Sequence, residues 1–339
     1  MTHPDDSMET TEGTGGASVD VHEEPYANDR YPYLRALCSS ALRQTPLIGH
    51  IALYTAGFCD FTVDVLDDQV SADTRESYKN AGSHITAHMR TFDESLAELS
   101  TGEMMRMVLE SGEVVVFCGR IRRNQHLVGM VLPAEGATPE MVDDADRDFF
   151  RLVTLIRKQF DLPDEDPGGF HDPGRPSESP PGRAYLRYVG ALDKRTEQAA
   201  TICADMLAPD MLHYVAYHRR WRPVFSVDVL DDPDLDNFRD VDPDLRRDLY
   251  EARGRRLRQD TARLAHALRA VTDRDFSRIV FDVQMGALYF HWLRPGDFVV
   301  GVTLWQNRVS DAEWRLREVI DAVRPLLVPT GVRGVGAGS

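Results

Sequence analysis

The chain has 339 residues, more than the roughly 100–200 of a single domain, so two domains are expected. Its formal net charge of −16 at pH 7 argues against a general nucleic-acid-binding protein, because phosphate neutralisation requires clustered Lys and Arg. The four scattered cysteines form no CxxC pair, which indicates a reducing intracellular environment and predicts that each is a small buried apolar residue. We expect a cytoplasmic protein, because the N-terminus lacks signal-peptide features and no apolar run approaches the ~18 residues of a membrane helix.

Three segments are poor in apolar residues and divide the chain. Residues 1–30 are acidic and predict a disordered tail, residues 163–183 predict an extended Pro/Gly-rich linker, and residues 329–339 predict a flexible end. The segments between them, 31–162 and 184–328, are the two expected domains.

Both blocks show the same order of periodic elements. The first predicts a helix at 33–43, two strands, a helix at 72–99, strands at 103–111, 113–121 and 126–133, and a closing helix around 149–156. The second predicts a helix at 194–207, two strands, a helix at 245–271, strands at 276–284, 287–293 and 297–305, and a closing helix around 316–323.

One short stretch occurs twice. FTVDVLDD (61–68) returns as FSVDVLDD (225–232), and its alternating pattern predicts a strand with one face more buried than the other, ended by Asp-Asp. Weaker matches pair 46–60 with 210–224, 126–133 with 298–305, and Tyr33-Leu34-Arg35 with Tyr185-Leu186-Arg187. We therefore predict a duplicated domain.

The predicted class is α+β, with two similar domains that each have a five-stranded antiparallel sheet and helices packed on it, in the order α-β-β-α-β-β-β-α. In this order, in the helix, Pro and β-hairpin opening at 42–61, and in VVVFCGRIRRNQHLVGMVLPAEGATPEMVDDADRDFF (114–150), each block resembles the roadblock domain. That is the dynein light-chain family that also occurs in bacteria beside small Ras-like GTPases. Two departures are the insertion DDPDLDNFRDVDPDL (231–245) and a first hairpin turn, TAGFCDF, that lacks Asp-Gly.

The resemblance implies a non-enzymatic interaction module, a scaffold or regulator of a small GTPase, in which two roadblock domains form an intramolecular pseudodimer or the chain forms a homodimer. Two alternatives stay open. Profilin-like domains of the PAS or GAF kind share parts of the element order and would make a small-ligand sensor. The stretch VLPAEGATPEMVDDADRDFFRL (131–152) also resembles YbjN-like peptide chaperones.

Motifs for catalysis or cofactors are not found: the chain lacks GxxxxGK[ST], a GxGxxG between strand and helix, GxSxG and HExxH, so we expect neither an enzyme nor a cofactor. His84 and His88, four apart on a helix, have no third ligand and are expected to be surface histidines. The carboxylates of the repeated stretch are expected to form turns rather than a cation site: Asp64, Asp67, Asp68, Asp228, Asp231 and Asp232.

Basic clusters on the acidic chain are the candidate partner-binding residues. Arg219, Arg220 and Arg222 surround an exposed Trp221 at a predicted hairpin turn, the residue mix enriched at protein interfaces. A second cluster lies on the helix that follows, where Arg255 and Arg256 are the candidates among Arg253, Arg255, Arg256, Arg258 and Arg263. A smaller patch is GRIRR (119–123). The expected partner is a protein, and the resemblance implies a small GTPase.

Overall fold

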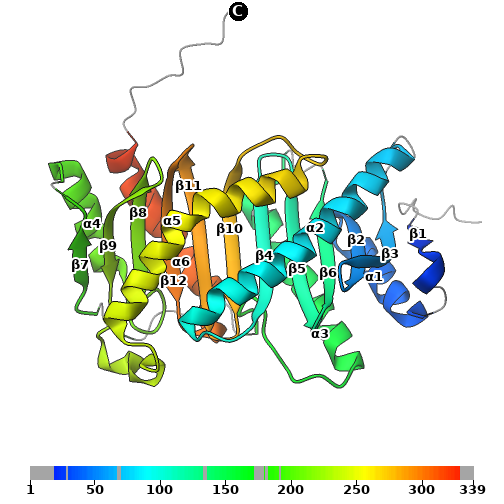
Figure 1. The fold of residues 1–339 in the computed structure, drawn as a ribbon, viewed down its shortest axis with the longest axis horizontal. Helices are drawn as coiled ribbons and strands as arrows, with labels where there is room; N and C mark the ends of the chain where they lie inside the picture. The colour runs from blue at the N-terminus through cyan, green and yellow to red at the C-terminus, as the bar shows by residue number, and fades with distance from the viewer. Residues whose placement is uncertain are drawn as a thin grey trace, which may run out of the picture.

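A computed structural model describes residues 19–27, 30–66, 70–132, 136–171, 179, 182–190 and 192–328. These residues form one antiparallel sheet of 12 strands in the order β1-β3-β2-β6-β5-β4-β10-β11-β12-β8-β9-β7, with helices on both faces (Figure 1). The α+β class expected from the sequence is therefore confirmed.

The first half of the sheet is formed by β1 (Asp20–Glu23), α1 (Pro32–Gln44), β2 (Ile48–Thr55), β3 (Phe58–Asp64), α2 (Ala72–Leu96), β4 (Met104–Ser111), β5 (Val115–Arg122), β6 (Gln125–Val131) and α3 (Pro139–Gln159). The second half is formed by β7 (Tyr185–Tyr188), α4 (Lys194–Met206), β8 (Tyr214–Arg219), β9 (Arg222–Asp228), α5 (Pro243–Leu268), β10 (Phe276–Val283), β11 (Gly286–Arg294), β12 (Asp297–Thr303) and α6 (Val309–Leu327). Short 3-10 turns lie at Pro25–Ala27, Ala97–Leu99, Pro233–Phe238 and Gln306–Arg308. From edge to centre, the strands of the two halves have matching positions: β1-β3-β2-β6-β5-β4 and β7-β9-β8-β12-β11-β10. The division into two separate domains stays a prediction, because the halves share one sheet.

The helices form two layers. α2 and α5 lie across one face of the sheet, in cyan and yellow in Figure 1, and α1, α3, α4 and α6 cover the other. Apolar side chains of successive strand residues therefore enter different cores: Leu53 packs with α1 and α3, whereas Tyr54 packs with α2. The expectation that the repeated strand has one less-buried face is wrong for the first copy, because β3 is buried from Cys59 to Asp64, but it holds in the second, where Ser226 is half-buried between the buried Phe225 and Val227. A sheet covered by helices on both sides leaves no solvent face.

The edge strands β1 and β7 were not predicted. β1 pairs with β3, Asp20 opposite Asp64, and β7 pairs with β9, Tyr185 opposite Asp228. Residues 20–27 are thus part of the fold, which corrects the prediction of a disordered tail over residues 1–30. Residues 1–18 and 28–29 of that predicted tail lie outside the described residues. The match of Tyr33–Arg35 with residues 185–187 is also wrong, because the former lie in α1 and the latter in β7.

The expected linker is packed against the molecule over its first residues. Arg157 donates from Nη2 to the Pro163 carbonyl at 3.0 Å, and the Gly168 amide donates to the Asp282 carboxylate. Ser310 donates from Oγ to the Gly169 carbonyl at 3.2 Å. Polar contacts, which a composition count cannot show, hold this segment; residues 172–178, 180–181 and the expected flexible end at 329–339 lie outside the described residues.

Candidate functional site

The two halves of the sheet meet where β4 pairs with β10, a junction that we call the seam. Val108 lies opposite Val280 at its centre. On one side of this pair Arg106 lies opposite Asp282, and on the other Arg278 lies opposite Glu110. An arginine therefore faces a carboxyl side chain at both flanking positions, and a register slip would separate both pairs.

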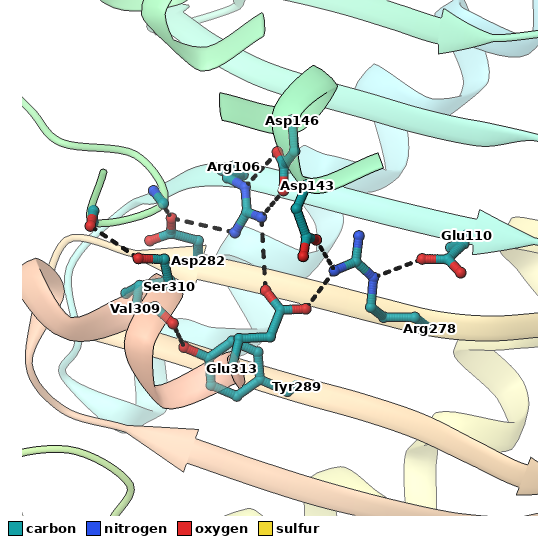
Figure 2. A network of polar contacts seen from close by, with 12 residues as sticks. Arg106, Glu110, Asp143, Asp146, Arg278, Asp282, Tyr289, Val309, Ser310 and Glu313 are labelled. Atoms are coloured by element: carbon teal, nitrogen blue, oxygen red, sulfur yellow. Dashed lines mark hydrogen bonds and ion pairs between the residues drawn. The ribbon is translucent and has the colours of Figure 1, made fainter. Parts of the chain in front are cut away.

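A buried ion network extends from the seam to α3 and α6, on one face of the sheet (Figure 2). Arg106 donates from Nε to Asp146 of α3 at 3.1 Å. Arg278 donates from Nη1 to Glu313 of α6 at 2.5 Å, and its Nε lies 2.8 Å from a Glu110 oxygen. Glu313 also lies 3.9 Å from Arg106. The network thus joins both central strands to one helix from each half.

Burial and the neighbouring arginines shift the pKa values of the network's carboxyl groups in opposite directions. Burial raises the pKa of Asp282 to about 8, although Arg106 lies 3.8 Å away and lowers it. Burial also opposes ionisation of Glu313, but Arg278, Arg317 and Arg106 together hold its pKa well below the usual range. Glu313 is therefore a buried anion whose charge depends on its arginine partners.

The repeated Asp residues form ion pairs with the next helix. Arg75 of α2 donates to Asp64, and Arg247 of α5 donates from Nη2 to Asp228 at 2.7 Å and to Asp231 at 2.6 Å. Asp232 accepts from the Asp234 amide at the start of a 3-10 turn, as a turn residue should. Asp67 and Asp68 lie outside the described residues.

The paired histidines of α2 are at the surface. His84 is exposed and His88 is half-buried, with a pKa lowered by burial and by His84. In the part of the chain that the structure describes, no group of three or more His, Cys, Asp or Glu could hold a metal ion. All four cysteines are free and buried, as expected.

The basic hairpin forms the predicted turn between β8 and β9. Arg220 and Trp221 have φ values of 51° and 65°, the left-handed conformation of a tight hairpin turn. Trp221 is half-buried against Phe298, with ring centroids 5.5 Å apart, so the expectation of an exposed Trp is wrong. Arg219 donates to the hydroxyl groups of Thr196 and Tyr217. Arg220 and Arg222 are exposed.

The arginines of α5 divide between two environments. Arg255 and Arg256 are exposed, as a solvated helix face predicts. Arg253 corrects that prediction: it is 6% exposed and its guanidinium lies 5.3 Å from the Phe92 ring centre. The inward turn of Arg253 places its cation between the two central helices, where an aromatic face stabilises it.

Two hollows adjoin the basic hairpin. The first, which we call the groove, has a volume of about 660 Å³; Trp221, Trp292 and Phe276 line it together with Arg220, Arg258 and Arg294. The second, which we call the basic hollow, has about 860 Å³ and is lined by Arg195, Arg219, Arg220, Arg222 and Arg294, with Asp193, Leu326 and Leu327. All four hairpin candidates therefore lie at these hollows, whereas the α5 candidates Arg255 and Arg256 do not line them.

Arg195, Arg294 and Trp292 were missed as candidates. Arg294 lies at the tip of the β11–β12 hairpin, and Arg195 in the first turn of α4. Neither lies in a local basic cluster, and only the fold brings them to the hairpin arginines. The tip sequence LRPGD of the β11–β12 hairpin was the one available signal for Arg294.

Comparisons with known proteins give a partial likeness among solved structures. No protein-family model matches the chain, and no curated protein matches it. Among solved structures, the chain is similar to a Roadblock/LC7 domain from Streptomyces avermitilis, with 14% identity, over 38% of this chain and 98% of that one, at a TM-score of 0.30. A likeness this low carries no argument about function. Among the described residues, none of the helices combines the length and the apolar character needed to cross a bilayer.

Proposed function

We propose that the chain is a non-enzymatic interaction platform that scaffolds or regulates a small Ras-like GTPase. The observation that carries the proposal is the pair of helices α2 and α5, which lie together across one face of a single sheet (Figure 1). The seam beneath them is fixed by paired strands and a buried ion network. Such a face is broad and pre-ordered, which lowers the entropic cost of binding a partner.

Direct contacts between the two helices support a rigid face. Arg253 of α5 donates to Ser95 of α2 at 3.0 Å. Arg246 donates to the Leu99 carbonyl just after α2, at 3.4 Å. A partner bound across both helices would therefore meet one surface rather than two that move independently.

The charge of α5 favours an acidic partner surface. The arginines at 255, 256, 258 and 263 are all exposed on a chain whose net charge is −16. Positive charge concentrated on one helix steers an acidic surface towards it and selects its orientation. The GTPase class itself comes from the roadblock resemblance of the sequence.

The test is recovery of a GTPase from the native lysate with the tagged full chain, in the presence of GDP or a non-hydrolysable GTP analogue. The variant Arg255→Glu/Arg256→Glu reverses two exposed charges on α5. The control Arg151→Glu reverses an exposed charge on α3, on the opposite face of the sheet.

Recovery of a small GTPase by the parent and the control, with loss in the α5 variant, supports the proposal. Failure to recover a GTPase with either nucleotide overturns it. Equal recovery by all three proteins would remove α5 as the binding face.

A further inference from the structure

Corresponding contacts show which residues of the two halves are equivalent. The pair Asp64–Arg75 in the first half corresponds to Asp228–Arg247 in the second. Each central helix also has a glycine against a ring from the second strand of its half: a Cβ at Gly82 would meet Tyr54, and one at Gly254 would meet His218. Strands and helices can therefore be aligned residue by residue.

The groove has a counterpart in the first half that is almost closed. Its volume is about 30 Å³, compared with about 660 Å³ for the groove. The residues Ala56, Gly57, Thr86, Arg90 and Asn124 line the counterpart, and by the alignment they correspond to Arg220, Trp221, Arg258, Ala262 and Gly296 of the groove. The same place in the fold is closed in one half and open in the other.

Particular side chains account for this difference. Arg90 of α2 occupies the position that the small Ala262 has in α5. Ser83 of α2 also donates to the Gly57 carbonyl and fastens the helix to the hairpin, whereas the corresponding Arg255 is exposed. The second half thus lacks both the arginine at this helix position and the fastening hydrogen bond.

Among the described residues that line it, the groove combines an apolar wall with two unpaired cations and a single carboxyl group, that of Asp275. Trp221 and Trp292 supply aromatic surface, and their rings both pack against Phe298. Arg220 and Arg258 have no ion-pair partner among the residues that the structure describes, in a protein of net charge −16. Aromatic residues beside arginine are the composition of interface hot spots, which favours an anionic ligand with an apolar group.

The length of the surface distinguishes a peptide from a small molecule. The groove and the basic hollow share Arg220 and Arg294, so they form one continuous surface. Beyond the shared residues the hollow adds Arg195, Arg219 and Arg222. An occupant that uses both hollows places an apolar side chain in the groove and several acidic groups along the arginines, which an extended chain does.

We propose that the groove and the basic hollow together bind an acidic peptide segment that carries one aromatic or large aliphatic anchor, and that each chain has a single such site. The proposal deepens the proposed function, because it gives an interaction platform a second contact of defined chemistry, which includes Arg258 of α5 but neither Arg255 nor Arg256. It needs no GTPase as the source of the peptide.

The experiment is a display selection of random 12-residue peptides on the immobilised full chain, followed by anisotropy titrations of the selected peptides with a fluorescent label. The expected peptides are rich in Asp and Glu around one Phe, Trp, Leu or Met, bind more weakly as salt rises, and, where they lack Trp, change the tryptophan fluorescence of the chain. Two variants copy the closed counterpart. Ala262→Arg introduces the arginine that lines the counterpart, and Trp221→Gly removes the aromatic wall at a φ of 65° that glycine adopts freely.

Each variant should weaken binding at least about tenfold, as the loss of a hot-spot contact does. Ala262→Arg should do so although it adds a positive charge. The control Ala97→Arg adds the same charge at an exposed position outside both hollows and should leave the affinity within about twofold.

Selection of no peptides, peptides without acidic enrichment, or equal affinity of the parent and Ala262→Arg would each overturn the proposal. These outcomes are independent of GTPase recovery. If the chain selects acidic peptides and recovers no GTPase, the peptide site is supported and the GTPase proposal is overturned. If it recovers a GTPase and selects no acidic peptides, the GTPase proposal is supported and the peptide site is overturned.

Discussion

Glu313→Gln tests whether the buried ion network holds the two halves of the sheet together. Glu313 is 5% exposed, and its carboxylate lies 2.5 Å from Arg278, 3.4 Å from Arg317 and 3.9 Å from Arg106. The amide removes the negative charge but keeps the shape of the side chain. The three guanidinium groups then lose a common buried anion.

The loss of stability depends on which carboxylate partners the arginines retain. Removal of one partner from a buried ion pair typically costs about 3–5 kcal/mol. Arg278 retains Glu110, and Arg106 retains Asp146. We therefore expect the lower end, a loss of about 3 kcal/mol in the free energy of unfolding.

The assay is urea unfolding at pH 7, followed by circular dichroism. The control Glu318→Gln, also on α6, removes a half-exposed partner of Arg315 at 2.8 Å and should cost less than about 1 kcal/mol. If the seam is the weak point of Glu313→Gln, its transition also broadens, because the halves unfold at different urea concentrations. A loss below about 1 kcal/mol, equal to that of the control, would refute the reasoning.

Three further substitutions test the packing and the titrating groups. Gly82→Ala should cost about 1–3 kcal/mol in urea unfolding, because its Cβ would overlap the Tyr54 hydroxyl, whereas Gly112→Ala, which meets nothing within 4 Å, should change stability by less than about 0.5 kcal/mol. His218→Tyr should make the protein less sensitive to acid: burial lowers the pKa of His218 to about 4, so the unfolded state binds its proton first and stability is lost as pH falls from about 6.5 towards 4. Asp282→Asn should have the opposite pH signature, because burial raises the pKa of Asp282 to about 8 and its contribution to stability is present at low pH and lost as pH rises towards 8. Unfolding midpoints measured across pH 4–9 that change in parallel for parent and variant would contradict either assignment.

The order of helices and strands was predictable from the sequence because apolar periodicity is local. Each long helix and each strand of the two predicted blocks has its counterpart in the structure. The edge strands β1 and β7 were not predictable in the same way: each has 4 residues, and pairing with a neighbouring strand, rather than burial, orders them. Composition alone placed β1 in a tail.

The candidate site was predictable only where its residues are adjacent in the chain. The hairpin arginines form a run of charge on an acidic background, whereas Arg294 and Arg195 reach the same hollows from other elements. The network at the seam was missed for a related reason. Arg106 in EMMRMVLES and Arg278 in FSRIVFDVQ each interrupt an apolar strand, but a charge within a strand does not reveal which distant carboxylate pairs with it.

The seam joins two parts of one polypeptide, and this covalent link changes how the assembly responds to its surroundings. An interface between separate chains opens on dilution, whereas a tethered one experiences a fixed effective concentration and stays closed however scarce the protein is. A substitution at the seam changes only one of its two strands, whereas in a homodimer it would change both. Arg106 and Arg278 are therefore free to change independently. The groove and its smaller counterpart differ in their lining residues. Two identical subunits of a homodimer could not acquire this asymmetry, because both have the same sequence.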